Sequence, residues 1–203
     1  MQHDDAVTAP TLAGDRVTLR AFTDSDVAAR QRHGWHREIE RAYGSDRVSG
    51  TMTDAEARAW VEDLAARTAA GATCWAIDSG GDLAGAVFLS DVRENGRKAR
   101  LAVGLYAPSL MGRGIGTDAI RVVLRHAFRS LRMHRVDLKV LADNSRAIAA
   151  YRACGFVEEG RERESCFVEG SWHDDVVMGV LDREFAAVDT RRLNPRRAAG
   201  AGS

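Results

Sequence analysis

A glycine-rich stretch in the middle of the chain decides the fold: it reads MGRGIGT and consists of Met111, Gly112, Arg113, Gly114, Ile115, Gly116 and Thr117. Apolar residues alternate from Leu101 to Leu105 before it, which predicts a strand, and recur at helical spacing from Ile120 to Leu131 after it. Glycines between a strand and a helix let the backbone approach a ligand, and the free N–H groups of the first helical turn attract anions. The stretch therefore indicates either a pyrophosphate-binding loop or a turn that serves packing alone.

Two other phosphate-binding motifs do not fit this stretch. A P-loop requires Gly-Lys followed by Ser or Thr, which is absent here. A dinucleotide-binding fingerprint requires a third Gly or Ala where this chain has Thr117, and it requires an N-terminal βαβ unit. Both classes are excluded, and an unrelated nucleotide-phosphate binder is disfavoured with them.

The second half of the chain alternates between helix and strand. The residues from Val136 to Val140 predict a strand, and Asn144 caps a helix that continues through Cys154. Two final strands are expected near residues 156–165 and 172–181, joined by a turn.

The first half predicts a short strand, helices and a β-meander. Asp24 offers an N-cap for a short helix, the irregular segment 35–48 predicts a loop with short helical pieces, and Thr53 with Glu56 fits a capping box. Strands are expected near residues 17–21, 74–77, 83–89 and 101–105. We therefore predict an α+β (mixed α/β) fold, with an about seven-stranded, mainly antiparallel sheet and helices on both faces.

Composition limits the class of protein. The chain has 203 residues, 45% hydrophobic content and a formal net charge of +0, which disfavours a nucleic-acid partner. We expect one domain at 11–189, a flexible N-terminus at 1–10 and a disordered C-terminal tail at 190–203. The three scattered cysteines form no Cys-x-x-Cys pair and indicate no metal site. A signal sequence and an apolar run of about 20 residues are both absent, so we predict a cytoplasmic protein without a membrane partner.

A second informative stretch runs from Asn144 to Phe156. Asn144 and Tyr151 are seven residues apart, so two helical turns place them on one face of the predicted helix. Alone, the pair is explained by a helix cap and a core tyrosine. Its position after the glycine-rich stretch favours a functional role more strongly than either stretch does by itself.

Together, the two stretches resemble the GNAT superfamily of acetyl-CoA-dependent N-acetyltransferases. The resemblance covers about residues 11–184 and is strongest over 101–156. The N-terminal helical insert and the ending from Gly160 to Leu181 resemble the branch with ribosomal-protein N-terminal (RimJ/RimL-type) and spermidine acetyltransferases. The phosphate loop of the family begins with Gln or Arg, so Met111 departs from its pattern.

The resemblance implies a sheet that is splayed in the middle and binds acetyl-CoA. The end of a splayed strand would bind the acetyl and pantetheine groups, the glycine-rich loop the pyrophosphate, and the helix cap the pantetheine arm. The residues implied in this binding are Gly104, Leu105, Tyr106, Met111, Gly112, Arg113, Gly114, Ile115, Gly116, Thr117 and Asn144.

The resemblance also implies the chemistry. Tyr151 is implied as the general acid that protonates the coenzyme A thiolate after direct attack by a neutral amine, without a covalent acyl-enzyme. Relatives carry a glutamate as general base at one of two strand positions, which here hold Arg100 and Lys139. These basic residues disfavour a strongly cationic acceptor such as a polyamine. The base stays open among Asp91, Glu38, Glu40, His173, Asp174 and a water chain.

Two functions from different classes follow from these residues. The leading hypothesis is an N-acetyltransferase that acetylates a primary amine of a small molecule or a protein N-terminus. The alternative is a non-catalytic acyl-CoA-binding sensor or regulatory module with the same fold. Tyr151 favours the enzyme. The sheet edges expected for this fold also predict a homodimer.

Overall fold

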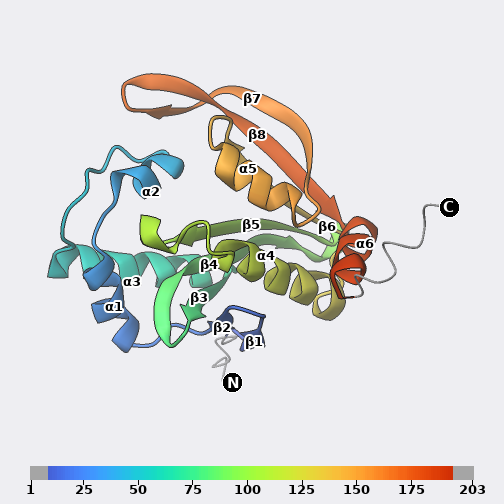
Figure 1. Cartoon of the computed structure of the whole chain (residues 1–203), viewed down its shortest axis with the longest axis horizontal. Helices are drawn as coiled ribbons and strands as arrows, with labels where there is room; N and C mark the ends of the chain where they lie inside the picture. The colour runs from blue at the N-terminus through green and yellow to red at the C-terminus, as the bar shows by residue number, and fades with distance from the viewer. Residues whose placement is uncertain (1–8, 194–203) are drawn as a thin grey trace.

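The computed structural model describes residues 9–193 and contains one sheet of eight strands in the order β1-β2-β3-β4-β5-β6-β8-β7 (Figure 1). The strands are β1 (Leu12–Ala13), β2 (Thr18–Arg20), β3 (Thr73–Ser79), β4 (Asp82–Arg93), β5 (Lys98–Leu105), β6 (Arg135–Leu141), β7 (Val157–Val168) and β8 (Ser171–Leu181). The helices are α1 (Ser25–His33), α2 (Arg37–Ala42), α3 (Asp54–Ala69), α4 (Ile115–Arg125), α5 (Ser145–Arg152) and α6 (Asp182–Leu193).

The sheet consists of two antiparallel halves that meet at one parallel contact. Strands β1 to β5 form a meander, and β8 pairs with both β6 and β7. Between the halves, β5 and β6 pair only through Lys98–Arg100 and Arg135–Asp137. Beyond these residues the two strands separate, so the sheet opens as a V. The predicted mainly antiparallel sheet with a splay in the middle is confirmed.

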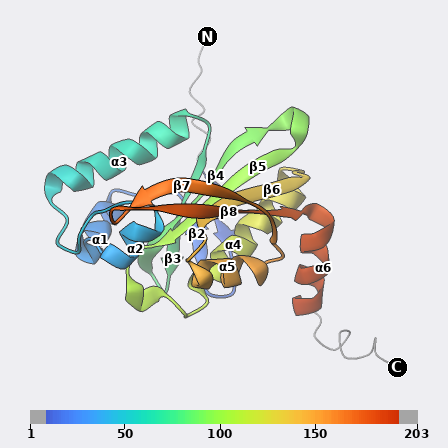
Figure 2. The same cartoon turned by 90° about the horizontal axis from the view of Figure 1, so that it is seen from above.

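Helices cover both faces of the sheet, as predicted: α3 lies on one face, and α4 with α5 lies on the other (Figure 2). The capping box at the start of α3 is confirmed, because Thr53 Oγ1 accepts the N–H of Glu56 at 3.3 Å and the Glu56 carboxylate accepts the N–H of Thr53 at 2.8 Å. Along α3, the Arg67 guanidinium lies 5.1 Å from the ring of Phe88 in β4.

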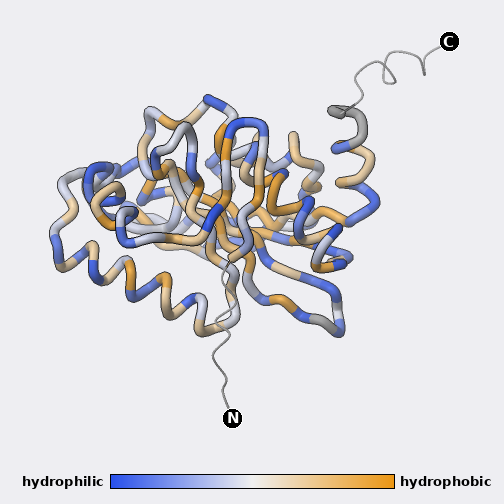
Figure 3. Tube along the Cα trace, turned by 90° about the horizontal axis from the view of Figure 1, so that it is seen from below, coloured by the Kyte–Doolittle hydropathy of each residue, from blue (hydrophilic) through white to orange (hydrophobic). Residues whose placement is uncertain are grey.

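The main core lies between the sheet and α4. Ile120, Val123 and Leu124 on the apolar side of α4 are fully or almost fully buried, against sheet residues that include Trp75 and Val87. Figure 3 shows the hydrophobic residues concentrated along the central strands. Each such side chain contributes about 1.5–3 kcal/mol of burial free energy. This packing fixes the start of α4 next to the open end of the V.

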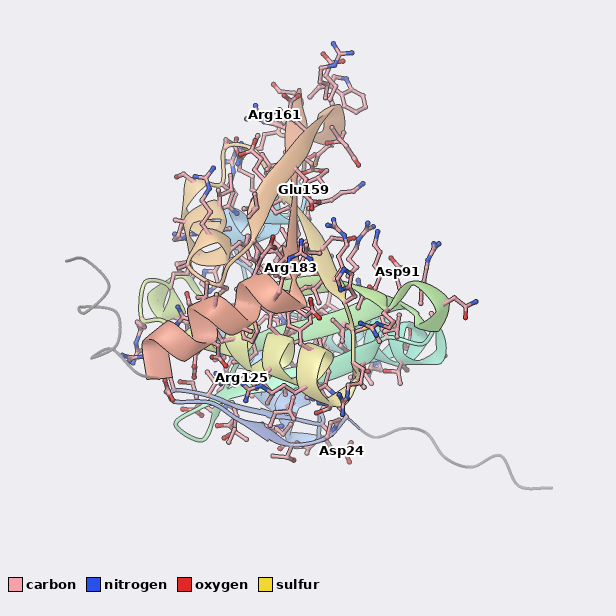
Figure 4. The ribbon with its side chains drawn as sticks, turned by 90° about the vertical axis from the view of Figure 1, so that its right-hand side faces the viewer. Asp24, Asp91, Arg125, Glu159, Arg161 and Arg183 are labelled. Carbon is pink, nitrogen blue, oxygen red and sulfur yellow. The ribbon has the colours of Figure 1, made fainter. Side chains whose placement is uncertain are left out.

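Two expectations about the ends of the domain need correction. The eighth strand, β1, was missed because two residues are too few to show alternation. Residues 190–193 of the expected tail form the end of α6. This helix is held to α4 by Asp189, which is 3% exposed and accepts a hydrogen bond at 3.2 Å from Arg125, labelled below α6 in Figure 4. Residues 1–8 and 194–203 of the expected tails lie outside the described residues.

The start of α1 also differs from expectation. Asp24 occupies the N-cap position, but its backbone is already helical and its side chain makes no capping hydrogen bond. Instead the Asp26 carboxylate accepts the N–H of Thr23 at 2.8 Å and two hydrogen bonds from Arg20. The buried acid two residues later therefore stabilises this helix start.

Candidate functional site

A cluster of charged side chains around the buried Asp137 holds the closed end of the V. Asp137 is 3% exposed, accepts a hydrogen bond from Arg100 Nε at 3.0 Å and pairs with Lys98 Nζ at 2.8 Å. Burial alone would raise the pKa of Asp137, but the hydrogen bonds from Lys98 and Arg100 hold it below 3.8. Arg100, which stands where the family resemblance implies a glutamate base, therefore joins β5 to β6 in this chain.

Above this closed end, side chains of β5, β6, α2, α4 and α5 line a cleft of about 440 Å³, a size typical of ligand pockets. Most of the residues selected from the sequence line it: Gly104, Leu105, Met111, Gly112, Gly114, Ile115, Gly116, Thr117, Asn144 and Tyr151. The cleft therefore joins the glycine-rich stretch and the Asn144–Tyr151 helix, which are separated in the sequence by β6.

The glycine-rich loop runs directly into α4. Gly112 and Gly114 have φ angles of +69° and +78°, a region that residues with a Cβ rarely adopt. A Cβ at Gly114 would lie 3.3 Å from the Arg16 side chain, so the loop also has little room there. The first-turn N–H groups of α4, from Ile115 to Thr117, have no partner within the helix, and the helix dipole adds positive potential. The loop thus fits a phosphate group bound through the backbone.

Two of the residues selected from the sequence, Tyr106 and Arg113, do not line the cleft. Tyr106 follows Leu105, and the alternation of a strand turns its side chain to the other face, where it packs against Trp60 and the guanidinium of Arg30 at 4.5 Å. Its N–H donates to Ala84 O at 2.9 Å.

Arg113 lies outside the main cleft and lines a separate polar pocket at the start of α4. Asp15, Arg16, Ser79 and Ile115 line the same pocket. Arg16 was missed by the sequence analysis, because the link between residues 16 and 114 is made by packing and not by spacing.

Tyr151 lies deep in the cleft. Its side chain packs edge to face against Phe156, with 5.7 Å between the ring centroids, and only 8% of the residue is exposed. Burial raises the pKa of Tyr151 to about 12, so its hydroxyl keeps its proton at neutral pH. Asn144 caps α5, as predicted, by accepting the N–H of Ala147 at 3.1 Å.

Tyr43 is a cleft residue that the sequence analysis did not select. It follows α2, and its hydroxyl donates to Val103 O of β5 at 2.9 Å, on the strand edge that the splay leaves without a β6 partner. A Cβ at Gly104 would lie 1.4 Å from the Tyr43 hydroxyl oxygen, so the glycine is required for this contact. Nothing in the irregular segment 35–48 distinguishes Tyr43 by pattern.

Two of the candidate bases are engaged away from the cleft. The Asp91 side chain is 60% exposed and lies 3.8 Å from Arg100, out on the β4–β5 hairpin (Figure 4). Glu38 pairs with Arg146 at 2.8 Å on the surface. Neither carboxylate lines the cleft.

Two further candidates are also occupied. Asp174 accepts the N–H of Glu164 at 2.9 Å and lies 3.6 Å from Arg161. Glu40 lies 4.0 Å from Arg47. Lys139, at the second position where the family resemblance implies a glutamate, lines the cleft and pairs with Glu162 at 2.7 Å.

A charged network closes the cleft at the α2 side. Arg41 donates to Glu169 in the β7–β8 turn at 2.9 Å and to Asp143 in the β6–α5 loop at 2.5 Å. These hydrogen bonds from Arg41 hold the pKa of Asp143 below 3.8. Asp143 also lies 3.5 Å from Nδ1 of His173, the remaining candidate base. The network therefore ties α2 to the β7–β8 hairpin.

The described residues give no sign of a metal centre or a membrane span. Among residues 9–193, no group of three or more His, Cys, Asp or Glu side chains could hold a metal ion. No helix in this part of the chain is long and apolar enough to cross a membrane.

The fold and the cleft define a class of proteins. The sequence profile of the acetyltransferase (GNAT) domain matches residues 16–157. The chain therefore belongs to the GNAT acetyltransferase family.

Two bacterial relatives are named as acetyltransferases. YdaF of Bacillus subtilis, provisionally named a ribosomal N-acetyltransferase, is 33% identical over 52% of this chain and 57% of its own length. Spermidine N(1)-acetyltransferase of Vibrio cholerae is 32% identical over 53% of this chain and 62% of its own length. The matches with these relatives thus span about three fifths of their length.

Solved structures match over more of the chain. A structure from T. thermophilus, provisionally named an acetyltransferase, is 31% identical with a TM-score of 0.77, over 92% of this chain and 96% of its own. RimJ of Mycobacterium smegmatis in complex with CoA-disulfide has a TM-score of 0.75 at 23% identity, over 93% of this chain and 96% of its own, and supports the fold alone.

Proposed function

We propose that the protein is an N-acetyltransferase that transfers the acetyl group of acetyl-CoA directly to a primary amine of a small molecule or a protein N-terminus. The cleft carries this proposal. It leads without interruption from the glycine-rich start of α4, where a phosphate group fits, past the free edge of β5 to the buried hydroxyl of Tyr151.

The described residues supply binding and proton transfer. The backbone at the start of α4 binds the pyrophosphate of acetyl-CoA, and the unpaired edge of β5 near Gly104 orients the thioester. Tyr151 donates its proton to the leaving sulfur as the C–S bond breaks. The raised pKa of Tyr151 suits this role, because a general acid must be protonated before the step.

The charges near the cleft favour an acceptor that is not a polyamine, although a relative in Vibrio cholerae is named for spermidine. A polycation requires carboxylates that are free to bind it. Here Glu38 is paired with Arg146, Glu162 with Lys139, and Glu169 with arginines of α2. These three carboxylates are thus paired with basic side chains, which supports an acceptor with a single amine.

A thiol-release assay tests the proposal. Acetyl-CoA is offered with a panel of amines that includes polyamines, amino acids and short peptides, while calorimetry measures acetyl-CoA binding to the same protein. We expect release that depends on the acceptor and is weakest for polyamines. Saturable binding without release for any amine would favour the alternative, a non-catalytic acyl-CoA sensor. Absence of binding would refute both functions.

Location and assembly are further proposals. The three cysteines are free thiols, which supports the reducing cytoplasm, and cell fractionation checks this. Strand β7 is 12 residues long, forms an edge of the sheet and is largely exposed, which supports a homodimer formed through this edge. Light scattering coupled to size-exclusion chromatography measures the mass in solution.

A further inference from the structure

His173 stands on the open face of the second half-sheet. Residues 176, 178 and 180 of β8 point into the core, so the alternation of the strand turns His173, Asp175 and Val177 to the opposite face. Lys139 of β6 is the register partner of Val177 and lines the cleft. His173 therefore lies on the same side of the sheet as Lys139.

His173 does not itself line the cleft, but a chain of neighbouring residues connects it to the cleft. His173 is the cross-strand partner of Cys166 in β7, which places the two side chains next to each other. A Cβ at Gly44 would lie 2.7 Å from Cys166 Sγ, so the turn that follows α2 lies against Cys166. The residue before Gly44 is Tyr43, whose hydroxyl reaches Val103 O in the cleft.

The imidazole of His173 is oriented by a carboxylate. Its Nδ1 lies 3.5 Å from Asp143 Oδ2, and Arg41 donates hydrogen bonds to the same carboxylate. A charged carboxylate beside Nδ1 keeps the ring proton there, so Nε2 presents its lone pair. This Nε2 is buried and has no hydrogen-bond partner among the described residues. A buried acceptor without a partner suggests a donor that arrives with the substrate.

We propose that Nε2 of His173 is the general base for the acceptor amine, directly or through one water, and that Asp143 is its positioning residue. This inference rests on the proposed acetyltransferase function. Nε2 takes the proton that an alkylammonium must lose before attack, and the freed lone pair on nitrogen forms the C–N bond. As the C–S bond breaks, Tyr151 protonates the sulfur. The amide nitrogen releases its second proton to solvent, which reprotonates Tyr151, and His173 returns its own proton to solvent.

Other titratable and charged groups lie on the elements around the ring and define the rival assignments. Arg41 approaches from α2, Cys166 from β7 and Asp143 from the β6–α5 loop, while Asp175 shares its face of β8. Arg41 cannot act as a base at neutral pH, and burial raises the pKa of the Cys166 thiol, so Asp175 is the strongest rival.

Two acceptors of nearly the same shape test the role of Nε2. Ethylamine is protonated at neutral pH, whereas the fluorines of 2,2,2-trifluoroethylamine keep its amine largely neutral. For His173→Gln we expect kcat/KM with ethylamine to fall about 100-fold or more, while the value with trifluoroethylamine falls less than about threefold. Acetyl-CoA affinity stays unchanged. Asp143→Asn lowers the ethylamine value in the same direction by a smaller factor, and Asp143→Glu restores part of it.

The chain offers a matched control for this variant. His134 forms a similar pair, with Nδ1 3.4 Å from Asp182, but it precedes β6 and lies outside the cleft. We expect His134→Gln to leave kcat/KM unchanged with both amines. Equal losses for both amines in His173→Gln, or no loss, overturn the assignment. If Asp175→Asn instead loses activity with ethylamine alone, Asp175 and not His173 is the general base. If the wild-type protein acetylates neither these two amines nor any amine of the panel, the proposed acetyltransferase function is refuted. This proposal then fails with it.

Discussion

The two sides of the cleft are built in different ways. The side proposed for acetyl-CoA consists mainly of backbone from one stretch, residues 104–117, and the packing of α4 holds it in place. The acceptor side consists of charged side chains from distant segments: Arg41 reaches Asp143, 102 residues away, and Glu169, 128 residues away. The first side therefore depends on glycine geometry, and the second on ion pairs that can change without loss of the fold.

The largest effect is expected where the two sides meet, at Tyr151. Tyr151→Phe removes the proposed acid and leaves the ring, so kcat should fall about 100- to 10,000-fold. The affinity for acetyl-CoA should stay within about twofold of wild type, because the cleft keeps its shape. Steady-state thiol release and calorimetry measure the two quantities. Tyr106→Phe is the matched control, since the hydroxyl of Tyr106 is also buried but its ring faces away from the cleft. A Tyr151→Phe enzyme with normal kcat would contradict the assignment of the acid.

The next effect tests the dependence of the acetyl-CoA side on backbone geometry. Gly114→Ala places a Cβ at a φ of +78° and 3.3 Å from the Arg16 side chain. We expect a loss of about 1–3 kcal/mol, shared between the free energy of unfolding and the binding of acetyl-CoA. Chemical denaturation and calorimetry separate the two parts. Gly96→Ala is the control, because nothing lies within 4 Å of its Cβ position. Equal results for the two variants would show that the loop geometry does not matter.

A smaller effect is expected on the acceptor side. Arg41→Ala removes the ties from α2 to Glu169 and Asp143, so the KM for the acceptor should rise about 3- to 10-fold, more at low salt than at high salt. The affinity for acetyl-CoA should not change. Arg67→Ala, which breaks an exposed pair with Asp63 within α3, serves as control. A change in acetyl-CoA affinity for Arg41→Ala would show that the two sides are not independent.

The smallest effect near neutral pH concerns the closed end of the V. Folding lowers the pKa of Asp137 from its ordinary value of 3.8. The stability that the ionised carboxylate contributes is therefore present above pH 3.8, and it is lost as the pH falls through the lower pKa of the folded state. Between pH 7 and about 5, we therefore expect no change in stability from this group. Acid unfolding followed by circular dichroism measures the loss below that range. Asp137→Asn should be less stable at pH 7 and should lose less of its stability in acid. An unchanged acid dependence would contradict this role of the cluster.

The features that the sequence predicted well are local ones. The capping box of Thr53 and Glu56 and the cap by Asn144 each join residues three positions apart, so spacing alone identifies them. Asp24 was a wrong expectation, because the carboxylate two positions later is paired with Arg20, and that contact depends on β2. β1 was missed because its two residues carry no readable period.

The sequence by itself determined the half of the cleft that is contiguous: a strand, glycines that permit left-handed backbone, and a helix whose first N–H groups are free. Only the tertiary structure placed Tyr43 over Gly104 and brought His173 to Asp143 and Arg41. The physical reason is the distance along the sequence over which each kind of interaction acts. Helical and strand periods act over a few residues, whereas these contacts join residues that only the pairing of β6, β7 and β8 and the docking of α2 bring together.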